Sequence, residues 1–287
     1  MTPLLELDAV TQAYPLPRDR LFGPRRSLTV LDGVDFAVGE GEAVGLVGES
    51  GAGKTTMTRA MLGMETPRGG AVRFDGRDLR EMGPDERRAF RRAVQVVMQN
   101  PRSSLDPRMS VGRSLLEPLR ALGVAEDHAA RVREVIGQVG LTESALARYP
   151  HEFSGGQLQR IAIARALAPR PRVLIADEPV SALDVSIQAQ VLNLLKDLVD
   201  ELGLSMVLIA HDLAVVAYST SRVSVIAGGR IVEQGAPRDL FVHPEAEATR
   251  NLVDAVLTME DGLAGRGLAA GAAATPPVTS HQARRGR

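Results

Sequence analysis

The nine residues from Gly48 to Thr56 combine residue types that bind phosphate. They run Gly-Glu-Ser-Gly-Ala-Gly-Lys-Thr-Thr and follow an apolar stretch at 43–47. This order matches the G-x-x-x-x-G-K-[ST] pattern, in which a buried strand ends in a glycine-rich turn and a helix then begins. Backbone N–H groups in such a turn form a concave anion nest, and the start of the helix adds positive potential. The sequence therefore predicts a nucleoside triphosphate site.

We call residues 48–56 the phosphate loop. Lys54 is placed to reach the terminal phosphates, and the Thr55 hydroxyl is placed to ligate Mg²⁺. A chance glycine-rich turn is the alternative, but it would not need the strand, the glycines, Lys-Thr and the helix in this order. The predicted phosphate-binding residues are Gly48, Glu49, Ser50, Gly51, Ala52, Gly53, Lys54, Thr55 and Thr56.

Polar residues also follow three other apolar stretches. The stretch at 173–176 ends in Asp177 and Glu178, the stretch at 206–210 ends in His211, and the stretch at 94–99 ends in Gln99. In open α/β sheets the ligand lies outside the carboxyl ends of the strands, so these side chains are expected to converge on the phosphate loop.

Each converging residue has a predicted role. Asp177 would hold Mg²⁺ beside Thr55, and Glu178 would polarise the attacking water. His211 would contact the γ-phosphate, and Gln99 would sense both Mg²⁺ and the γ-phosphate. Taken alone, Asp-Glu-Pro is also typical of a helix N-terminus, and a single histidine or glutamine at a strand end is usually structural.

Two further features have two interpretations each. Ser154-Gly155-Gly156-Gln157 is typical of a plain helix N-cap, but paired glycines at a helix start also let a phosphate approach the backbone. Tyr14 is either a half-buried residue at a strand end or an aromatic ring that stacks on adenine. Spacing alone does not separate these readings of Tyr14.

Composition limits the class of protein. The 287 residues include 34 Lys and Arg against 35 Asp and Glu, so the basic field of a dedicated nucleic-acid binder is missing and no nucleic-acid partner is expected. The absence of cysteine excludes disulfides, thiol catalysis and iron–sulfur clusters. No apolar run reaches the ~18–20 residues that span a bilayer. We expect a soluble, cytosolic chain with any membrane role supplied by a partner.

Together these motifs resemble the ATPase subunits of ABC transporters, over about residues 4–257. The resemblance implies an α/β fold, a P-loop NTPase core with a mixed sheet, flanking helices and an N-terminal antiparallel β subdomain. It also implies an inserted helical subdomain at about 100–165. A Gly/Ala-rich tail, residues 258–287, is expected to be disordered. The matching motifs are Walker A (48–55), Walker B (173–177) with the catalytic Glu178, the Q-loop at Gln99, the signature motif 153–157, the D-loop 181–184 with Asp184, and the switch His211.

The resemblance implies partners and cofactors. Such subunits bind ATP and Mg²⁺ and pair head to tail with a second ABC ATPase subunit, as a homodimer or a heterodimer. Each Ser154-type motif then faces the nucleotide of the other subunit, and Tyr14 is expected to stack on adenine. The dimer would drive membrane permease subunits at the cytoplasmic face of the inner membrane and, indirectly, serve an extracytoplasmic solute-binding protein.

The group within the family is also indicated. Residues 99–108 and 176–186 resemble the oligopeptide/dipeptide/nickel importers, and Leu21-Phe22-Gly23 resembles the second ATPase subunit of such systems. This implies import of peptides or of a related small solute such as nickel or glutathione. Members of this group usually carry His-Pro-Tyr-Thr followed by a longer, cysteine-bearing extension. Here His243-Pro244 is followed by Glu245-Ala246, and the cysteine-bearing extension is missing.

A non-transport ABC ATPase acting on nucleic acid or the ribosome is the alternative. Its repair members carry a long coiled coil between the Walker motifs, whereas only 123 positions (177 − 54) separate Lys54 from Asp177 here. Its translation members usually carry two cassettes, and this chain has one set of motifs.

Overall fold

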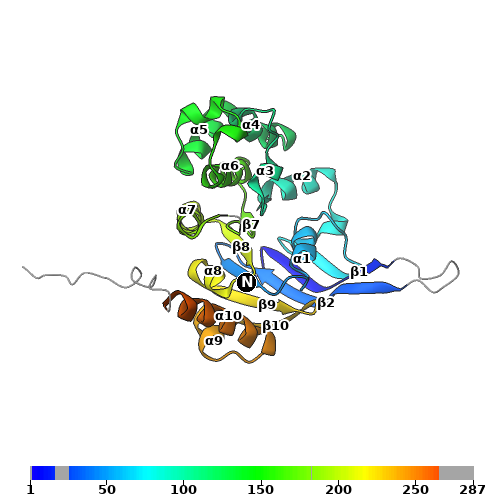
Figure 1. The fold of residues 1–287 in the computed structure, drawn as a ribbon. Helices are drawn as coiled ribbons and strands as arrows, with labels where there is room; N and C mark the ends of the chain where they lie inside the picture. Colours follow the sequence, from blue (N-terminus) through cyan, green and yellow to red (C-terminus); the bar gives the residue numbers. More distant parts are fainter. Residues whose placement is uncertain (1, 17–25, 182, 265–287) are drawn as a thin grey trace, which may run out of the picture.

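The computed structural model describes residues 2–16, 26–181 and 183–264. Two sheets and a group of helices make up this part of the chain (Figure 1). Leu21-Phe22-Gly23, Ala182 of the predicted D-loop and most of the predicted tail lie outside the described residues.

The larger sheet is mixed and carries the phosphate loop. Its order is β10-β9-β3-β8-β7-β6, with only β10 antiparallel to its neighbour. Residues of β7 alternate between two apolar cores: Leu174 and Ala176 face one, while Val173 and Ile175 face the other. This central strand is buried on both faces, as its continuous apolar run predicts. The strands are β3 (Ala43–Val47), β6 (Val94–Val97), β7 (Val173–Asp177), β8 (Ser205–Ala210), β9 (Arg222–Ala227) and β10 (Arg230–Gly235).

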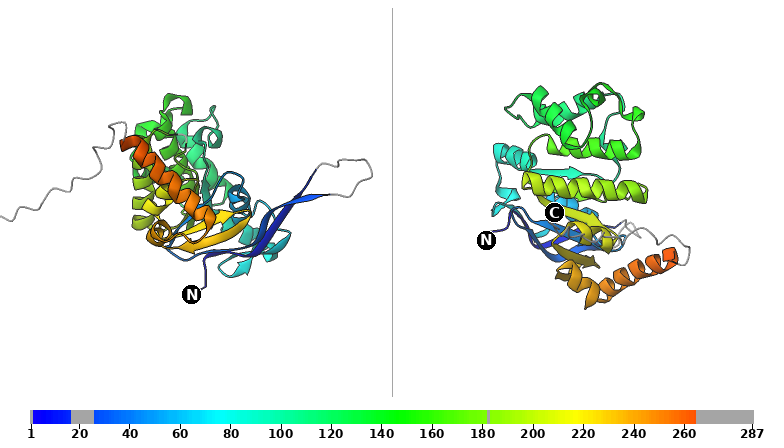
Figure 2. Two further views of the ribbon diagram at one scale, coloured as in Figure 1. Left: turned by 60° about the horizontal axis from the view of Figure 1, so that its bottom comes forward. Right: turned by 90° about the vertical axis from the view of Figure 1, so that its left-hand side faces the viewer.

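The smaller sheet is antiparallel, with the order β2-β1-β4-β5. The hairpin of β1 and β2 extends well beyond the rest of this sheet (Figure 2). Register shifts on either side of Val10, together with a positive φ of 46° at Ala9, mark a bulge in β1. The strands are β1 (Leu5–Pro15), β2 (Ser27–Val38), β4 (Gly69–Phe74) and β5 (Arg77–Asp78).

Helices cover both faces of the larger sheet. Helix α1 buries Met57 and Met61 in the core that it shares with the smaller sheet. Helices α7 and α8 bury Leu195 and Val216 in the core on the opposite face. These helices and the short ones beside them are α1 (Lys54–Met61), η1 (Leu79–Glu81), α2 (Pro84–Ala93), α7 (Val185–Leu202), α8 (Leu213–Ser219) and α9 (Pro237–Val242).

A group of helices stands apart from the two sheets, at the top of Figure 1. Its interior is apolar and includes Leu115, Leu119 and Ile136, all fully buried. Helix α6 joins this group to β7 and packs against α7. The group consists of α3 (Pro101–Ser104), α4 (Val111–Ala121), α5 (His128–Gln138), η2 (Glu143–Ala147), η3 (Pro150–Glu152) and α6 (Gly155–Leu167).

The last element among the described residues is α10 (Glu247–Ala264), which packs against α8 and β9. Helix α10 includes residues 258–264, which belong to the tail predicted to be disordered, and the rest of that tail lies outside the described residues. Those seven positions include Met259, Leu263 and Ala264, which are good helix formers, and the helix tolerates the single Gly262 among them. In the part of the chain that the structure describes, no helix is both long and apolar enough to cross a membrane.

Candidate active site

Each glycine of the phosphate loop stands at a position where local geometry disfavours any other residue. Gly51 and Gly53 have φ values of 83° and 113°, in the left-handed region that only glycine adopts without strain. A Cβ at Gly48 would lie 2.3 Å from the carbonyl oxygen of Ile226 on β9. The loop is therefore built around backbone conformations that place N–H groups, rather than side chains, at the end of β3.

Lys54 begins α1 and curls back over the loop. Its side chain is 8% exposed, and Nζ donates to the carbonyl oxygens of Gly48, at 2.6 Å, and Glu49, at 3.0 Å. Burial lowers the pKa of Lys54, while the charges of Glu178 and Asp177 oppose that shift. An ammonium has three donors, so two held by the loop leave one for a phosphate.

Glu178 is held from two sides directly after β7. Gln99 Nε2 donates to Glu178 Oε2 at 2.9 Å, and His211 Nδ1 lies 3.7 Å from Glu178 Oε1. The backbone of Glu178 has a φ of 45°, a strained region for a residue with a side chain, and its N–H donates to the carbonyl oxygen of Ile209 at 2.9 Å. Backbone strain of this kind persists only where the surrounding structure holds the residue in place, and it is concentrated at active sites.

These residues share one open cavity of about 480 Å³. It brings the phosphate loop together with Gln99, Glu178 and His211, as the strand-end pattern predicts. Sequence reasoning missed Val30, which comes from β2 of the other sheet and carries no motif. The lining residues are Val30, Ser50, Gly51, Gly53, Lys54, Thr55, Thr56, Gln99, Glu178 and His211.

Asp177 is not among the residues that line this cavity. Burial raises the pKa of Asp177, and the charge of Glu178 adds to that shift. A hydrogen bond with Thr58 and the charge of Lys54 act in the opposite direction. Asp177 is therefore a carboxylate kept close to the cationic end of the loop in a poorly solvated place.

The Ser154–Gln157 motif does not reach the phosphate loop of its own chain. Ser154 caps α6: its Oγ accepts from the Gln157 N–H at 3.4 Å, and its own N–H donates to Gln157 Oε1 at 3.1 Å. Gly155 lines a separate cavity beside Asn100. Asp184 also lies outside the phosphate cavity and caps α7 by accepting from the Ile187 N–H at 3.0 Å.

Tyr14 is likewise absent from the lining of the phosphate cavity. Its hydroxyl donates to Glu65, which also pairs with Arg59 at 3.2 Å. The Tyr14 hydrogen bond is the main cause that lowers the pKa of Glu65. Adenine stacking by Tyr14 stays a prediction.

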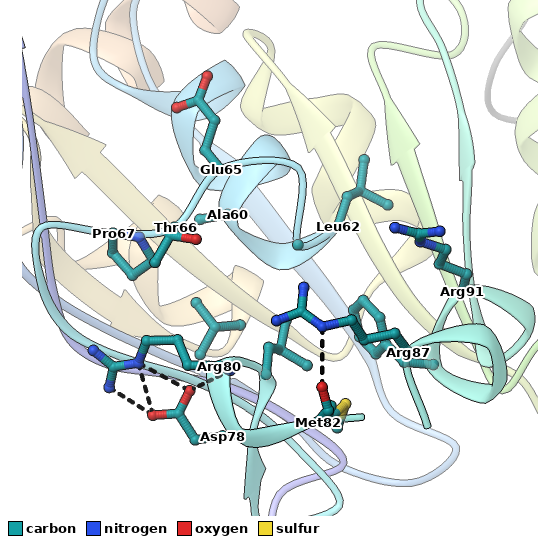
Figure 3. A pocket seen from close by; sticks show the side chains of 14 residues that line it. Ala60, Leu62, Glu65, Thr66, Pro67, Asp78, Arg80, Met82, Arg87 and Arg91 are labelled. Atoms are coloured by element: carbon teal, nitrogen blue, oxygen red, sulfur yellow. Dashed lines mark hydrogen bonds and ion pairs between the residues drawn. The ribbon is translucent and has the colours of Figure 1, made fainter. Parts of the chain in front are cut away.

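Glu65 also borders a second, narrow cavity between α1 and α2 (Figure 3). At its opposite side Arg80 is paired with Asp78, and Arg87 Nε donates to the Met82 carbonyl oxygen at 3.1 Å. None of the predicted site residues lines this cavity.

Comparison with known proteins agrees with this geometry. The family model described as "ABC transporter" matches residues 31–181. The dimeric structure of a post-hydrolysis state of the ATP-binding cassette MJ0796 bound to ADP and Pi superposes with a TM-score of 0.71 at 29% identity. It covers 82% of this chain and 99% of that one. The chain belongs to the ABC transporter family, which confirms both the predicted resemblance and the predicted fold class.

Curated relatives are more similar in sequence. A putative peptide import ATP-binding protein of Brucella ovis is 46% identical over 257 residues, which cover 89% of this chain and 79% of that protein. The oligopeptide transport ATP-binding protein OppF of Escherichia coli K12 is 48% identical, over 81% of this chain and 71% of that protein. The glutathione import ATP-binding protein GsiA of the same organism is 45% identical over 90% of this chain, which spans 42% of its length. The chain is an ATP-binding and ATP-hydrolysing transporter subunit, as predicted.

Proposed function

We propose that this chain is the motor of an importer for peptides or for a related small solute, such as glutathione or nickel. The relatives at 45–48% identity are named as ATP-binding proteins of peptide, oligopeptide and glutathione import. The nucleic-acid or ribosome alternative finds no support among these relatives.

One observation carries the proposed chemistry: the Glu178 carboxylate stands between Gln99 and His211 in the cavity that the phosphate loop lines. From there Glu178 would orient the attacking water and accept its proton. Lys54 would stabilise charge on the terminal phosphates, and His211 would contact the γ-phosphate. Roles of this kind suffice, because catalysis of phosphoryl transfer rests mainly on positioning and electrostatics.

The donors near the loop also fit Mg²⁺. Among the described residues no cluster of three or more His, Asp or Glu side chains could hold a metal alone. Thr55, which lines the cavity, Gln99 and the nearby Asp177 supply a few oxygen ligands. Mg²⁺ prefers one or two protein ligands together with phosphate oxygens and water. Bound with ATP, it would neutralise phosphate charge.

A second ATPase subunit would complete the site. Ser154–Gln157 and Asp184 lie outside the phosphate cavity of their own chain, and Ser154–Gln157 opens α6, whose N-terminus suits an anion. Both are therefore proposed to act at the nucleotide of a partner, which is either a second copy or a sister ATPase. The cassette MJ0796 has been seen as a dimer, with 28% identity and a TM-score of 0.69.

The remaining organisation follows from this role. We assign residues 1–257 to the ABC ATPase domain, with the helical subdomain at about 100–165 passing the motion of Gln99 to membrane permease subunits. The chain would be peripheral, held by those permeases at the cytoplasmic face of the inner membrane. A solute-binding protein outside the membrane would deliver the cargo.

Co-purification tests the proposal. The chain is expressed with the products of its neighbouring genes and isolated from detergent-solubilised membranes. A multispanning membrane protein is expected to accompany it, and ATP hydrolysis by the reconstituted complex should rise when a peptide-loaded binding protein is added. Association with nucleic acid or ribosomes instead of a membrane protein would contradict the proposal.

A further inference from the structure

The two glycines of the Ser154–Gln157 motif have different surroundings. A methyl group built on Gly156 would lie 2.6 Å from Cγ2 of Ile187, far closer than the ~3.5–4.0 Å at which carbon atoms pack. A methyl group on Gly155 would meet Leu183 Cδ2 at 3.4 Å, which the end of a flexible side chain can accommodate. Only Gly156 is therefore confined by a branched side chain at close range.

Ile187 lies on the first turn of α7, and neighbouring groups hold that turn in place. Asp184 caps the helix by accepting from the Ile187 N–H. Gln188 Nε2 donates to the carbonyl oxygens of Val180, at 3.1 Å, and Leu183, at 3.0 Å. The Ile187 side chain packs against the core that α6 and α7 share. These hydrogen bonds and the packing hold the Ile187 side chain in place, so it cannot easily move away from Gly156.

We infer that Ile187 is a positioning residue for ATP hydrolysis. It seats the N-terminus of α6, and residue 156 is glycine because Ile187 occupies the space that a side chain would need there. The Cβ direction of residue 156 points into its own chain, toward α7, so an added methyl meets Ile187 rather than an approaching phosphate. This inference rests on the proposed role of Ser154–Gln157 at the partner's nucleotide.

The same segment leads back to the chain's own cavity. The Ser181 N–H and hydroxyl both donate to the Glu178 carbonyl oxygen, at 3.3 and 3.1 Å. Ser181 also accepts from Gln99 Nε2 at 3.2 Å. The described residues on either side of Ala182, from Glu178 to Ser181 and from Leu183 to Gln188, are therefore held by hydrogen bonds at short intervals. A shift at one nucleotide would reach the α6 N-terminus, and hence the other nucleotide, through Ile187.

A double-mutant cycle tests the inference on the full chain. The four proteins are the wild type, Gly156→Ala, Ile187→Ala and the combination of both. Gly156→Ala is expected to lower ATP turnover by about tenfold or more, because overpacking displaces the α6 N-terminus. Ile187→Ala alone should also lower turnover, because the α6 N-terminus loses its seat, but it removes the obstructing atoms, so Gly156→Ala should lower turnover far less in the Ile187→Ala chain than in the wild type. If Gly156→Ala costs the same factor in both chains, glycine is needed for nucleotide approach and the inference is wrong.

Controls separate this result from misfolding and from failure of the proposed function. If Gly156→Ala lowers the melting temperature of the wild type, it should lower that of the Ile187→Ala chain much less, and an equal drop in both would overturn the inference. Val185→Ala, on the same turn but 81% exposed, should rescue nothing. Rescue of Gly155→Ala by Ile187→Ala would show a non-specific effect and would also overturn it. A wild type without ATP turnover, even when assembled with the ATPase subunit that co-purifies with it, would instead refute the proposed function.

Discussion

Arg131 offers a quantitative test of how the helical group is held to the ATPase core. Its side chain is 3% exposed, and its guanidinium donates to the carbonyl oxygens of Leu167, at 2.6 Å, and Ala168, at 3.0 Å. These carbonyls lie at the C-terminal end of α6, where helical carbonyls have no partner within the helix. Glu134 forms an ion pair with the same guanidinium at 2.8 Å. Arg131 therefore caps the helix that carries Ser154.

The substitution Arg131→Met keeps the bulk and removes the cap. Two hydrogen bonds to a charged group are lost, each of about 1.5–3 kcal/mol, and the Ala168 carbonyl loses this partner, whereas the Leu167 carbonyl still accepts from the Arg170 N–H at 3.0 Å. The neutral methionine avoids the cost of burying the guanidinium charge, which offsets part of this loss. The net loss in the free energy of unfolding is then about 2–4 kcal/mol. At roughly 2–3 °C per kcal/mol for a chain of this size, the melting temperature should fall by about 5–10 °C.

Urea unfolding followed by far-ultraviolet circular dichroism measures this loss. Arg170→Met is the matched control, because Arg170 is 48% exposed and pairs with Glu126 and Glu134 at the surface. Such exposed pairs contribute less than about 1 kcal/mol. A midpoint for Arg131→Met equal to that of the wild type, or equal losses for the two variants, would refute the cap.

Three further predictions follow from the site and its supports. Glu178→Gln should lower ATP hydrolysis by about 100-fold or more while ATP binding changes little, as measured by phosphate release and equilibrium binding; normal turnover would remove Glu178 from its role. Gly48→Ala should weaken binding of a fluorescent ATP analogue by about tenfold or more, because its methyl would collide with the Ile226 carbonyl, and an unchanged affinity would count against that contact. Burial raises the pKa of Glu42, but hydrogen bonds with Arg222 and with the Gly39 N–H outweigh it, so the net pKa is lowered. The stability that Glu42 adds is then fully present above its ordinary pKa of 4.5 and is lost as the pH falls from there through the lowered pKa of the folded state. Glu42→Gln should therefore destabilise the chain at pH 7 and by steadily less as the pH is lowered below 4.5, and a pH-independent difference in urea midpoints would contradict this.

Local chemistry explains why much of the site could be predicted from the sequence. The phosphate loop is specified by short-range rules, since glycine alone adopts the φ values of Gly51 and Gly53. The meeting of Gln99, Glu178 and His211 also followed, because parallel buried strands bring their carboxyl ends to one edge.

Other features depend on contacts between distant segments and carry no sequence pattern. The Tyr14 hydroxyl meets Glu65 only because β1 crosses near the end of α1. Val30 enters the phosphate cavity from the other sheet. The proximity of Ile187 to Gly156 depends on how α6 crosses α7, which neither helix encodes alone.

The central claim is that one chain supplies only half of each ATP site. The most direct measurement is the mass, by light scattering, of the Glu178→Gln chain, with any sister ATPase that co-purifies, before and after Mg·ATP is added. From a monomer of 30.6 kDa, ATP should add one further ATPase subunit, and a Ser154→Arg change should prevent this even though ATP still binds. A species that stays at 30.6 kDa with ATP bound would contradict the claim.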